Sequence, residues 1–318
     1  MRQVAGPELA EPGNRKNTQD DEQAQRSYPL PEMEQFWQLT KGAGVRVAVI
    51  DDGFDLNHPA LQKLNTVVAV DVTRGVMDAA PQSRQDTHGT KVAGILFAQH
   101  QVDGLAVPKV LGLIPDSEAV LIRLASSWTT DIINAFLVAG SAEADIINCS
   151  WSVKLNRQPI ADVIASLALN GRGGKGTLIV FAAGNQAGEL TKHDLAATEY
   201  ALTVAAVDQQ GQLVGAWGDS VDLAARTQLP TTQRSDIFKW HYTTLGYTSG
   251  AAPLVAGTAG LLLARHPNLT AQQVITRLKQ SVTHKDELDL RVRGKGLFEP
   301  HRLLSVLSSD LPDKTNNE

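Results

Sequence analysis

Several features that mark particular classes of protein are missing from this sequence of 318 residues. Cys149 is the only cysteine, so no intrachain disulfide can form and a disulfide-stapled scaffold is excluded. The N-terminal region lacks an apolar stretch of signal-peptide length, and no segment is predicted to span a membrane. We therefore expect a cytoplasmic protein without a membrane partner, unless the chain is a trimmed piece of a longer precursor.

Basic patches are also absent. The chain has 29 Lys and Arg against 34 Asp and Glu, which gives a net charge of −5, and its basic residues are scattered. Nucleic acid is therefore not an expected partner. No G-x-x-x-x-G-K-[ST] or H-E-x-x-H motif occurs, so nucleotide hydrolysis and zinc proteolysis have no support. GRGGKG at 171–176 has the G-x-G-x-x-G spacing, but it precedes a predicted strand, so we interpret it as a loop.

The pattern of apolar residues predicts one α/β domain over residues 28–308, between polar tails at 1–27 and 309–318 that we expect to be mobile. Predicted strands are continuous apolar runs, as expected of strands covered on both faces, at 45–50, 119–125, 145–151, 177–183 and 201–207. Predicted helices follow His88, cover 130–142 and 159–169, run from Ser249 to about Arg265, and start again at Thr270. This alternation favours a mainly parallel sheet with helices on both sides.

Four polar residues stand at the boundaries of these elements. Asp51 and Asn185 follow predicted strands, and His88 and Ser249 open predicted helices. Each has an ordinary explanation by itself: the first two as turn residues, the histidine as a structural hydrogen-bonding group and the serine as a helix cap. Together they supply an acid, a base, a nucleophile and an oxyanion donor, in the order Asp, His, Ser that is one of three known for acyl-transfer triads.

The residues around these four carry a family resemblance. The segments are VAVIDDGFDLNHPAL, DTHGTKVAGIL, IINCSWS, VFAAGNQAG and YTSGAAPLVAGTAGLLL, in that order along the chain. They resemble the signature blocks of subtilisin-like serine peptidases, and the likeness extends over about residues 30–307. It implies the subtilisin-like α/β/α sandwich, with three layers around a mainly parallel central sheet.

The resemblance also implies roles. Ser249 would attack the peptide carbonyl, His88 would take and return the proton, and Asp51 would hold the imidazole. Asn185 would donate its side-chain amide to the oxyanion, beside the Ser249 backbone N–H, and Ser249 could cap its helix as well. The polypeptide substrate would dock as an extended strand between two segments, Ser150, Trp151, Ser152 and Ala182, Ala183, Gly184.

Some positions depart from the family. Tyr247 stands where Gly usually precedes the Thr-Ser pair, Lys91 stands in place of a second histidine, and Ser152 replaces a glycine of the binding strand. Asp52 stands where Thr or Ser is usual in secreted bacterial members, although kexin-like convertases share Asp-Asp-Gly. These departures bear on substrate preference and remove no group of the triad.

Two other functions are possible alternatives. An α/β-hydrolase esterase would need G-x-S-x-G and the order Ser, acid, His, but position 247 is Tyr and both Asp51 and His88 precede Ser249, so this interpretation fails on both counts. A catalytically silent relative that only binds peptides is the second alternative. The chemistry requires no cofactor. No metal-ligand pattern is visible, although a structural calcium is compatible with the family.

Overall fold

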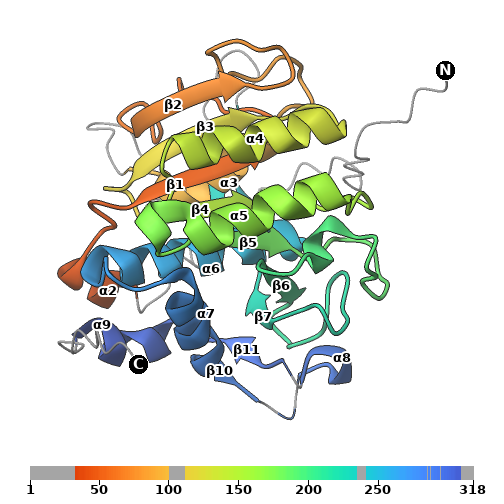
Figure 1. Cartoon of the computed structure of the whole chain (residues 1–318). Coiled ribbons are helices and arrows are strands. Elements are labelled where there is room, and N and C mark those ends of the chain that lie inside the picture. The colour runs from red at the N-terminus through yellow and green to blue at the C-terminus, as the bar shows by residue number, and fades with distance from the viewer. Residues whose placement is uncertain are drawn as a thin grey trace.

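The computed structural model describes residues 33–99, 112–234, 241–284, 286, 288–293 and 295–308. The predicted tails, residues 1–27 and 309–318, lie outside these ranges. A nine-stranded sheet in the order β10-β11-β7-β6-β5-β4-β1-β3-β2 forms the middle layer. Helices α4 and α5 cover the face that is nearer in Figure 1, and α3 and α6 cover the other face. The predicted three-layer α/β/α architecture is confirmed.

The strands of the central sheet are parallel, apart from the β10–β11 pair at one edge. Their bounds are β1 Arg46–Asp51, β2 Asn65–Asp71, β3 Glu118–Arg123, β4 Ile146–Cys149, β5 Leu178–Ala182, β6 Leu202–Val207, β7 Leu223–Arg226, β10 Val282–Thr283 and β11 Leu297–Phe298. A separate antiparallel pair joins β8 Leu229–Gln233 to β9 His241–Leu245.

The α-helices are α2 Met33–Leu39, α3 His88–Phe97, α4 Thr129–Ser141, α5 Gln158–Gly174, α6 Tyr247–Arg265, α7 Ala271–Gln280, α8 Leu290–Arg293 and α9 Leu304–Ser308. Two short 3₁₀ turns lie at Leu195–Ala197 and Pro300–Leu303. At the start of α7 the predicted capping box is present, because Thr270 accepts a hydrogen bond from the Gln273 amide and the Gln273 side chain accepts one from the Thr270 amide.

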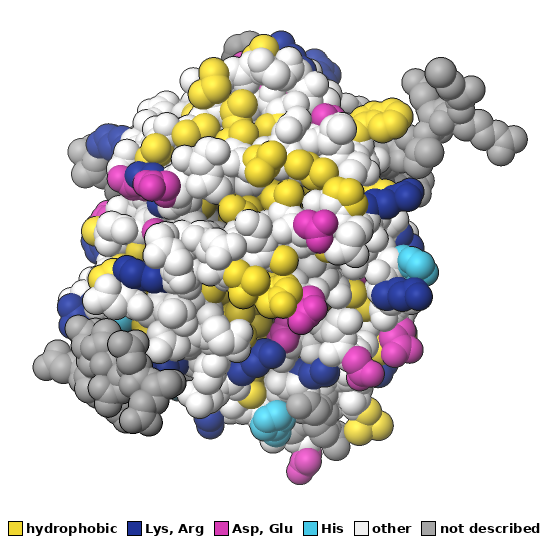
Figure 2. All heavy atoms as spheres, in the orientation of Figure 1, with side chains coloured by type: hydrophobic (Ala, Val, Ile, Leu, Met, Phe, Trp, Pro, Cys, Tyr) yellow, Lys and Arg dark blue, Asp and Glu magenta, His cyan; other side chains and the backbone are white. Residues whose placement is uncertain are grey.

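Alternate residues of each central strand belong to different core clusters. In β1, Val47 and Val49 pack in the cluster that contains α3 and α6, whereas Ala48 and Ile50 pack in the cluster that contains α4 and α5. Both faces of the strand are therefore buried, which explains why the sequence shows a continuous apolar run instead of alternation. On the face seen in Figure 2, apolar side chains gather over α4 and α5, and acidic and basic side chains are interspersed around them.

The five predicted strands and the five predicted helices are all present, with ends shifted by a few residues. Sequence patterns missed β2, β7, β10, β11 and the β8–β9 pair. The last pair is rich in threonine and sits against α3, where Thr232 Oγ1 donates to the Thr90 carbonyl at 2.8 Å. A polar strand that satisfies its hydroxyls against a neighbouring helix shows no apolar signal.

Helix α6 is apolar and long enough to cross a membrane by length and composition alone, but it is largely buried in the fold. Every residue from Thr248 to Leu263 is buried. It packs against β4, β5, β6 and β7, and against α3. Its first turn therefore lies where these strands end.

The GRGGKG segment is a structural loop, as the sequence indicates. The helical backbone of α5 is interrupted at Gly171, Arg172 and Gly173, with φ of +54° at Arg172. The Arg172 side chain is largely buried. It donates to Asp145 at 2.5 Å and to the carbonyls of Gly176, Leu269 and Pro267. This guanidinium joins the end of α5, the start of β4 and the α6–α7 connection.

We expect Arg172→Ala to lower the free energy of unfolding by about 3 kcal/mol, because it breaks the ion pair with Asp145 and leaves the carbonyls of Gly176 and Leu269 without their side-chain donor. The measurement is urea unfolding, in which the midpoint should fall while the m-value stays constant. Arg157→Ala, at an exposed arginine, is the matched control. Equal urea midpoints for the two variants would show that Arg172 does not stabilise the fold by joining these three segments.

Candidate active site

The predicted site residues meet at the carboxyl edge of the sheet. Asp51 is the last residue of β1, residues 150–152 follow β4, and residues 183–185 follow β5. Since β1, β4 and β5 are neighbouring parallel strands, these three segments leave the sheet side by side. The first turns of α3 and α6 bring His88 and Ser249 to the same region.

His88 and Asp51 form a buried pair. His88 Nδ1 lies 2.8 Å from Asp51 Oδ1, and the side chains are 10% and 3% exposed. A carboxylate can only accept, so Nδ1 carries the proton and the lone pair of the neutral ring is on Nε2. Nε2 is buried and has no hydrogen-bond partner among the described residues. The hydrogen bond to Asp51 thus fixes the tautomer of the His88 ring and leaves Nε2 as its basic nitrogen.

The pKa of His88 is raised. Burial lowers it, but the charge of Asp51, the hydrogen bond to Asp51 and the charge of Asp52 together raise it more, against an opposing effect of Lys91. A higher pKa makes the ring a stronger base. It also means that the ring becomes protonated at a higher pH than an ordinary histidine.

Ser249 is the third residue of α6 and is buried, with 5% of the residue exposed. Its Oγ donates to the Ser150 carbonyl at 3.0 Å, and no hydrogen bond joins it to His88 in the structure. Gly246 is the residue before the helix, and its position has no side-chain cap. The serine therefore does not serve as the N-cap of α6, which was the ordinary reading of its place in the sequence.

Asn185 is held by Thr248, the residue before the serine. Its Oδ1 accepts from the Thr248 backbone N–H at 3.2 Å and from the Thr248 hydroxyl at 2.7 Å. Because a backbone N–H can only donate, the oxygen end of the carboxamide must face Thr248. The Nδ2 group is then the free donor end, and it donates to no described residue. This arrangement fits the predicted oxyanion donor.

A cavity of about 380 Å³ opens beside Ser249 and Asn185. One wall is formed by residues 150–154 and the other by residues 183–190, with Asp194, Ala216 and Thr248 between them. Five of the six predicted substrate-binding residues line it: Ser150, Trp151, Ser152, Ala183 and Gly184. Ala182 does not, because it belongs to the core beneath. The sequence analysis missed Lys154, Glu189 and Leu190, which lie in loops without a recognisable pattern.

Two side chains set the shape of the walls. The Trp151 indole donates to the Ile50 carbonyl at 2.7 Å and packs edge-on against Phe181, so it anchors the wall to the sheet. Ser152, which replaces the glycine usual in the family, faces the opposite wall. A Cβ placed on Gly184 would approach Ser152 Oγ to 2.8 Å. The serine hydroxyl therefore narrows the space between the walls.

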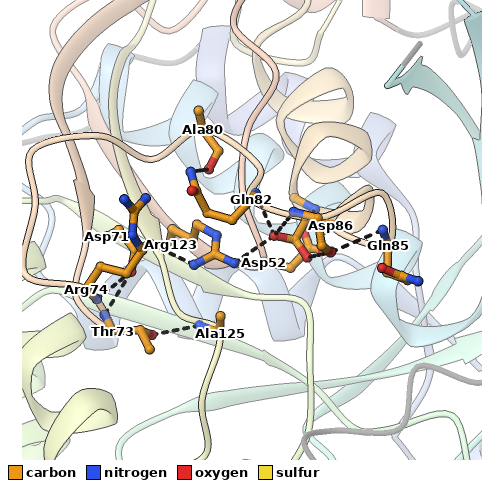
Figure 3. A network of polar contacts seen from close by, with 12 residues as sticks. Asp52, Asp71, Thr73, Arg74, Ala80, Gln82, Gln85, Asp86, Arg123 and Ala125 are labelled. Atoms are coloured by element: carbon orange, nitrogen blue, oxygen red, sulfur yellow. Dashed lines mark hydrogen bonds and ion pairs between the residues drawn. The ribbon is translucent and has the colours of Figure 1, made fainter. Parts of the chain in front are cut away.

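A buried arginine supports the loop that leads into His88. Arg123 ends β3, in register with Asp51 of β1 on one side and Asp71 of β2 on the other. Its guanidinium donates to Asp71 and to Asp86, each at 2.7 Å (Figure 3). Asp86 is two residues before His88. The ion pairs thus fix the approach to α3 against the sheet.

Asp52 is the main site residue that the sequence analysis did not assign. Its carboxylate accepts from the backbone N–H groups of His88 at 3.0 Å and Gly89 at 2.7 Å, so it caps α3 from 36 residues away in the chain. Figure 3 draws it beside the Arg123 network. The signal in the sequence that could have identified Asp52 was the Asp-Asp-Gly triplet itself, because one carboxylate is usually enough to form a turn.

Tyr247 has a left-handed backbone, with φ of +54°, and its side chain is 46% exposed. This conformation explains why glycine is usual at this position in the family, since other residues adopt it only at a cost. Its carbonyl accepts from Thr227 Oγ1 at 2.5 Å, which helps to hold the strained turn. The first residue of α6 is therefore held in an unfavourable conformation.

Within the residues that the structure describes, no group of three or more His, Cys, Asp or Glu side chains could hold a metal ion. Cys149 is buried and free, and its pKa is raised well above the ordinary value by burial and by the charge of Asp51. It is therefore an inert thiol and not a reactive one.

The fold and the site define an α/β protein with an Asp–His pair, a buried serine and an amide donor around one cavity. Comparison with known proteins agrees with this class: the model of the subtilase family matches residues 42–296. This chain belongs to the subtilase family.

Individual relatives are moderately similar. A calcium-dependent protease of Nostoc sp. is 30% identical over 321 residues, covering 87% of this chain and 47% of the relative. Mycosin-4 of Mycobacterium tuberculosis is 33% identical, covering 90% and 70%. A protease structure from Pseudoalteromonas arctica has a TM-score of 0.75 at 22% identity, covering 90% of this chain and 98% of that one, and supports the fold. The chain spans about half the length of the Nostoc relative.

We expect Tyr247→Gly to leave stability unchanged or raise it by up to about 1.5 kcal/mol. Relief of the left-handed backbone gains roughly 1–2 kcal/mol, whereas the greater freedom of unfolded glycine costs roughly 0.5–1 kcal/mol. Tyr200→Gly is a matched control, because Tyr200 has φ of +68°, is 44% exposed and lies before β6, at the opposite edge of the sheet. Thermal unfolding of both measures the effect, and a large loss in Tyr247→Gly alone would show that its ring packs structurally.

Proposed function

We propose that this chain is a serine endopeptidase that cleaves peptide bonds through an acyl-enzyme intermediate. Membership of the subtilase family and the protease names of its relatives support peptidase activity. The single observation that carries the proposal is the Asp51–His88 pair, with its unpartnered Nε2, beside a buried serine at a cavity.

In this mechanism Ser249 is the nucleophile and His88 its general base. The serine hydroxyl turns from the Ser150 carbonyl toward His88 Nε2, which takes its proton as Oγ attacks the carbonyl carbon. Asp51 stabilises the imidazolium that forms. His88 then gives the proton to the leaving amine, and a water molecule hydrolyses the acyl-enzyme by the same route in reverse.

The oxyanion is stabilised by two donors, Asn185 Nδ2 and the Ser249 backbone N–H. The hydrogen bonds that Asn185 Oδ1 accepts from Thr248 keep its donor end in place before the reaction, so little reorganisation is needed when negative charge develops. The N-terminus of α6 adds the positive end of its dipole at the same place.

The substrate is an extended polypeptide that adds as a strand beside residues 150–152 and inserts one side chain into the cavity. This docking mode favours unfolded chains and exposed loops. Ser152 lines the cavity and Tyr247 directly precedes Thr248, which also lines it, so these two residues are candidates to set side-chain preference. The proposed chemistry uses side chains and backbone groups of this chain and needs no cofactor, nucleic acid or membrane.

A fluorophosphonate probe should label Ser249 in the native protein, and Ser249→Ala should abolish both labelling and cleavage of an unbiased peptide library. The same library assayed with Tyr247→Gly and Tyr200→Gly separates specificity from stability, since only the first should alter the cleavage profile. Native protein that binds extended peptides but shows neither labelling nor cleavage would support the alternative of a silent peptide-binding relative.

Asn185→Ala should reduce kcat by about 10²–10³-fold with a small change in KM, because the lost donor acts mainly in the transition state. This range is the one known for loss of the side-chain oxyanion donor in subtilisin itself, a member of the same family. The variant should still be labelled by the probe, more slowly. An unchanged kcat would remove Asn185 from the oxyanion site.

A further inference from the structure

Two adjacent carboxylates end β1, and they have different partners. Asp51 Oδ1 contacts the His88 ring at 2.8 Å and accepts from the Asp52 backbone N–H at 2.8 Å. Asp52 accepts from the backbone of His88 and Gly89. Four hydrogen bonds therefore close a ring from β1 to α3 and back, in which one carboxylate holds the imidazole and the other holds the backbone that carries it.

Asp52 does for α3 what a local cap would ordinarily do. Thr87, the residue before the helix, makes no side-chain cap hydrogen bond. The helix start is also pressed against the turn after β1, because a Cβ placed on Gly89 would come within 2.5 Å of the Gly53 carbonyl oxygen. A cap from another element fixes where the helix begins relative to Asp51, which a cap from Thr87 would not do.

Keeping the Asp52 carboxylate ionised costs free energy in the folded protein. Burial raises its pKa and so does the charge of Asp51, while His88 and the two amide donors lower it, and the result is a pKa of about 6 against an ordinary 3.8. Because the folded protein holds this proton more tightly than the unfolded chain, the contribution of Asp52 to stability is lost as pH rises from about 4 through 6. A residue that destabilises the fold at neutral pH is a candidate for a functional role.

We propose that Asp52 is a positioning residue, which fixes the His88 imidazole against Asp51 and Ser249 by holding the first two amides of α3. This inference rests on the proposed function, in which His88 is the general base. Removal of the carboxylate lets the start of α3 move, and a displacement of about 1 Å at a catalytic group can cost up to 10²-fold in rate.

Asp52 also acts on His88 through its charge. The charged groups that act on this pair are Asp51 from β1 and Lys91 from α3, with the Arg123–Asp86 ion pair nearby (Figure 3). Asp52 raises the pKa of His88, and Lys91 lowers it. Loss of the Asp52 charge should therefore lower the pKa of His88 and shift the acidic limb of activity to lower pH.

The test compares three variants with a matched control. Asp52→Ala removes both acceptors, Asp52→Ser keeps one hydroxyl acceptor without charge, and Asp52→Asn keeps the shape with one acceptor. Asp55→Asn removes a carboxylate from the same loop. That carboxylate accepts from the Asn57 amide and not from α3, and the backbone N–H of Asp55, which donates to Thr90 Oγ1 of α3, is kept in the variant. If Asp52→Ala does not fold, Asp52→Ser and Asp52→Asn can still be compared with the Asp55→Asn control.

We expect kcat to fall by about 10–100-fold in Asp52→Ala and by less in the other two, with KM nearly constant. The acidic limb of the kcat/KM profile should move to lower pH in all three, and Asp55→Asn should match the wild type in both respects. A wild-type kcat and acidic limb in Asp52→Ala and Asp52→Asn would overturn the proposal, even if their Tm differed from that of the wild type.

A second readout needs no activity. In the Ser249→Ala background, NMR titration should show a lower pKa of His88 after Asp52→Asn, and amide exchange at His88 and Gly89 should be faster. If the protein cleaves no peptide but these changes appear, positioning stands and the peptidase function fails. If neither NMR change appears, positioning fails whatever the activity.

Discussion

Packing of α6 across the sheet is the constraint on which the site depends. This helix is buried from Thr248 to Leu263 and lies against four parallel strands as well as α3. Because it is covered on all sides, its position is set by the core and not by the loops around the cavity. The packing of the core thus places Ser249, the N-terminus of α6 and the Thr248 backbone amide at the carboxyl edge of the sheet.

The same edge concentrates charge that the fold must compensate. Asp51, Asp52, Asp71 and Arg123 lie at or directly after the ends of three neighbouring strands, all largely shielded from water. Arg123 forms ion pairs with Asp71 and the nearby Asp86, whereas Asp51 and Asp52 face His88 and backbone amides. The negative charges of Asp51 and Asp52 therefore act on the imidazole and raise its pKa.

The contacts that hold the site rigid and the strained backbone lie in different segments. The ion pairs of Arg123 attach the loop before α3 to the sheet, and the hydrogen bond of the Trp151 indole attaches one wall of the cavity. The left-handed backbone is at Tyr247, the exposed first residue of α6. A bulky residue at a position suited to glycine places an aromatic ring within two residues of the serine, at a cost that the buried remainder of α6 can bear.

The sequence by itself determined the layers and singled out the four residues that the proposed mechanism uses. Continuous apolar runs indicate strands covered on both faces, and Asp51, His88, Asn185 and Ser249 sit at boundaries that local patterns can detect. Only the tertiary structure decided that Ala182 lies beneath the cavity, that Ser249 bonds to the Ser150 carbonyl, and that Asp52 caps a helix 36 residues away. The physical reason is that local patterns record burial and backbone preference along one segment, whereas a hydrogen bond between distant segments depends on how both are placed by the core.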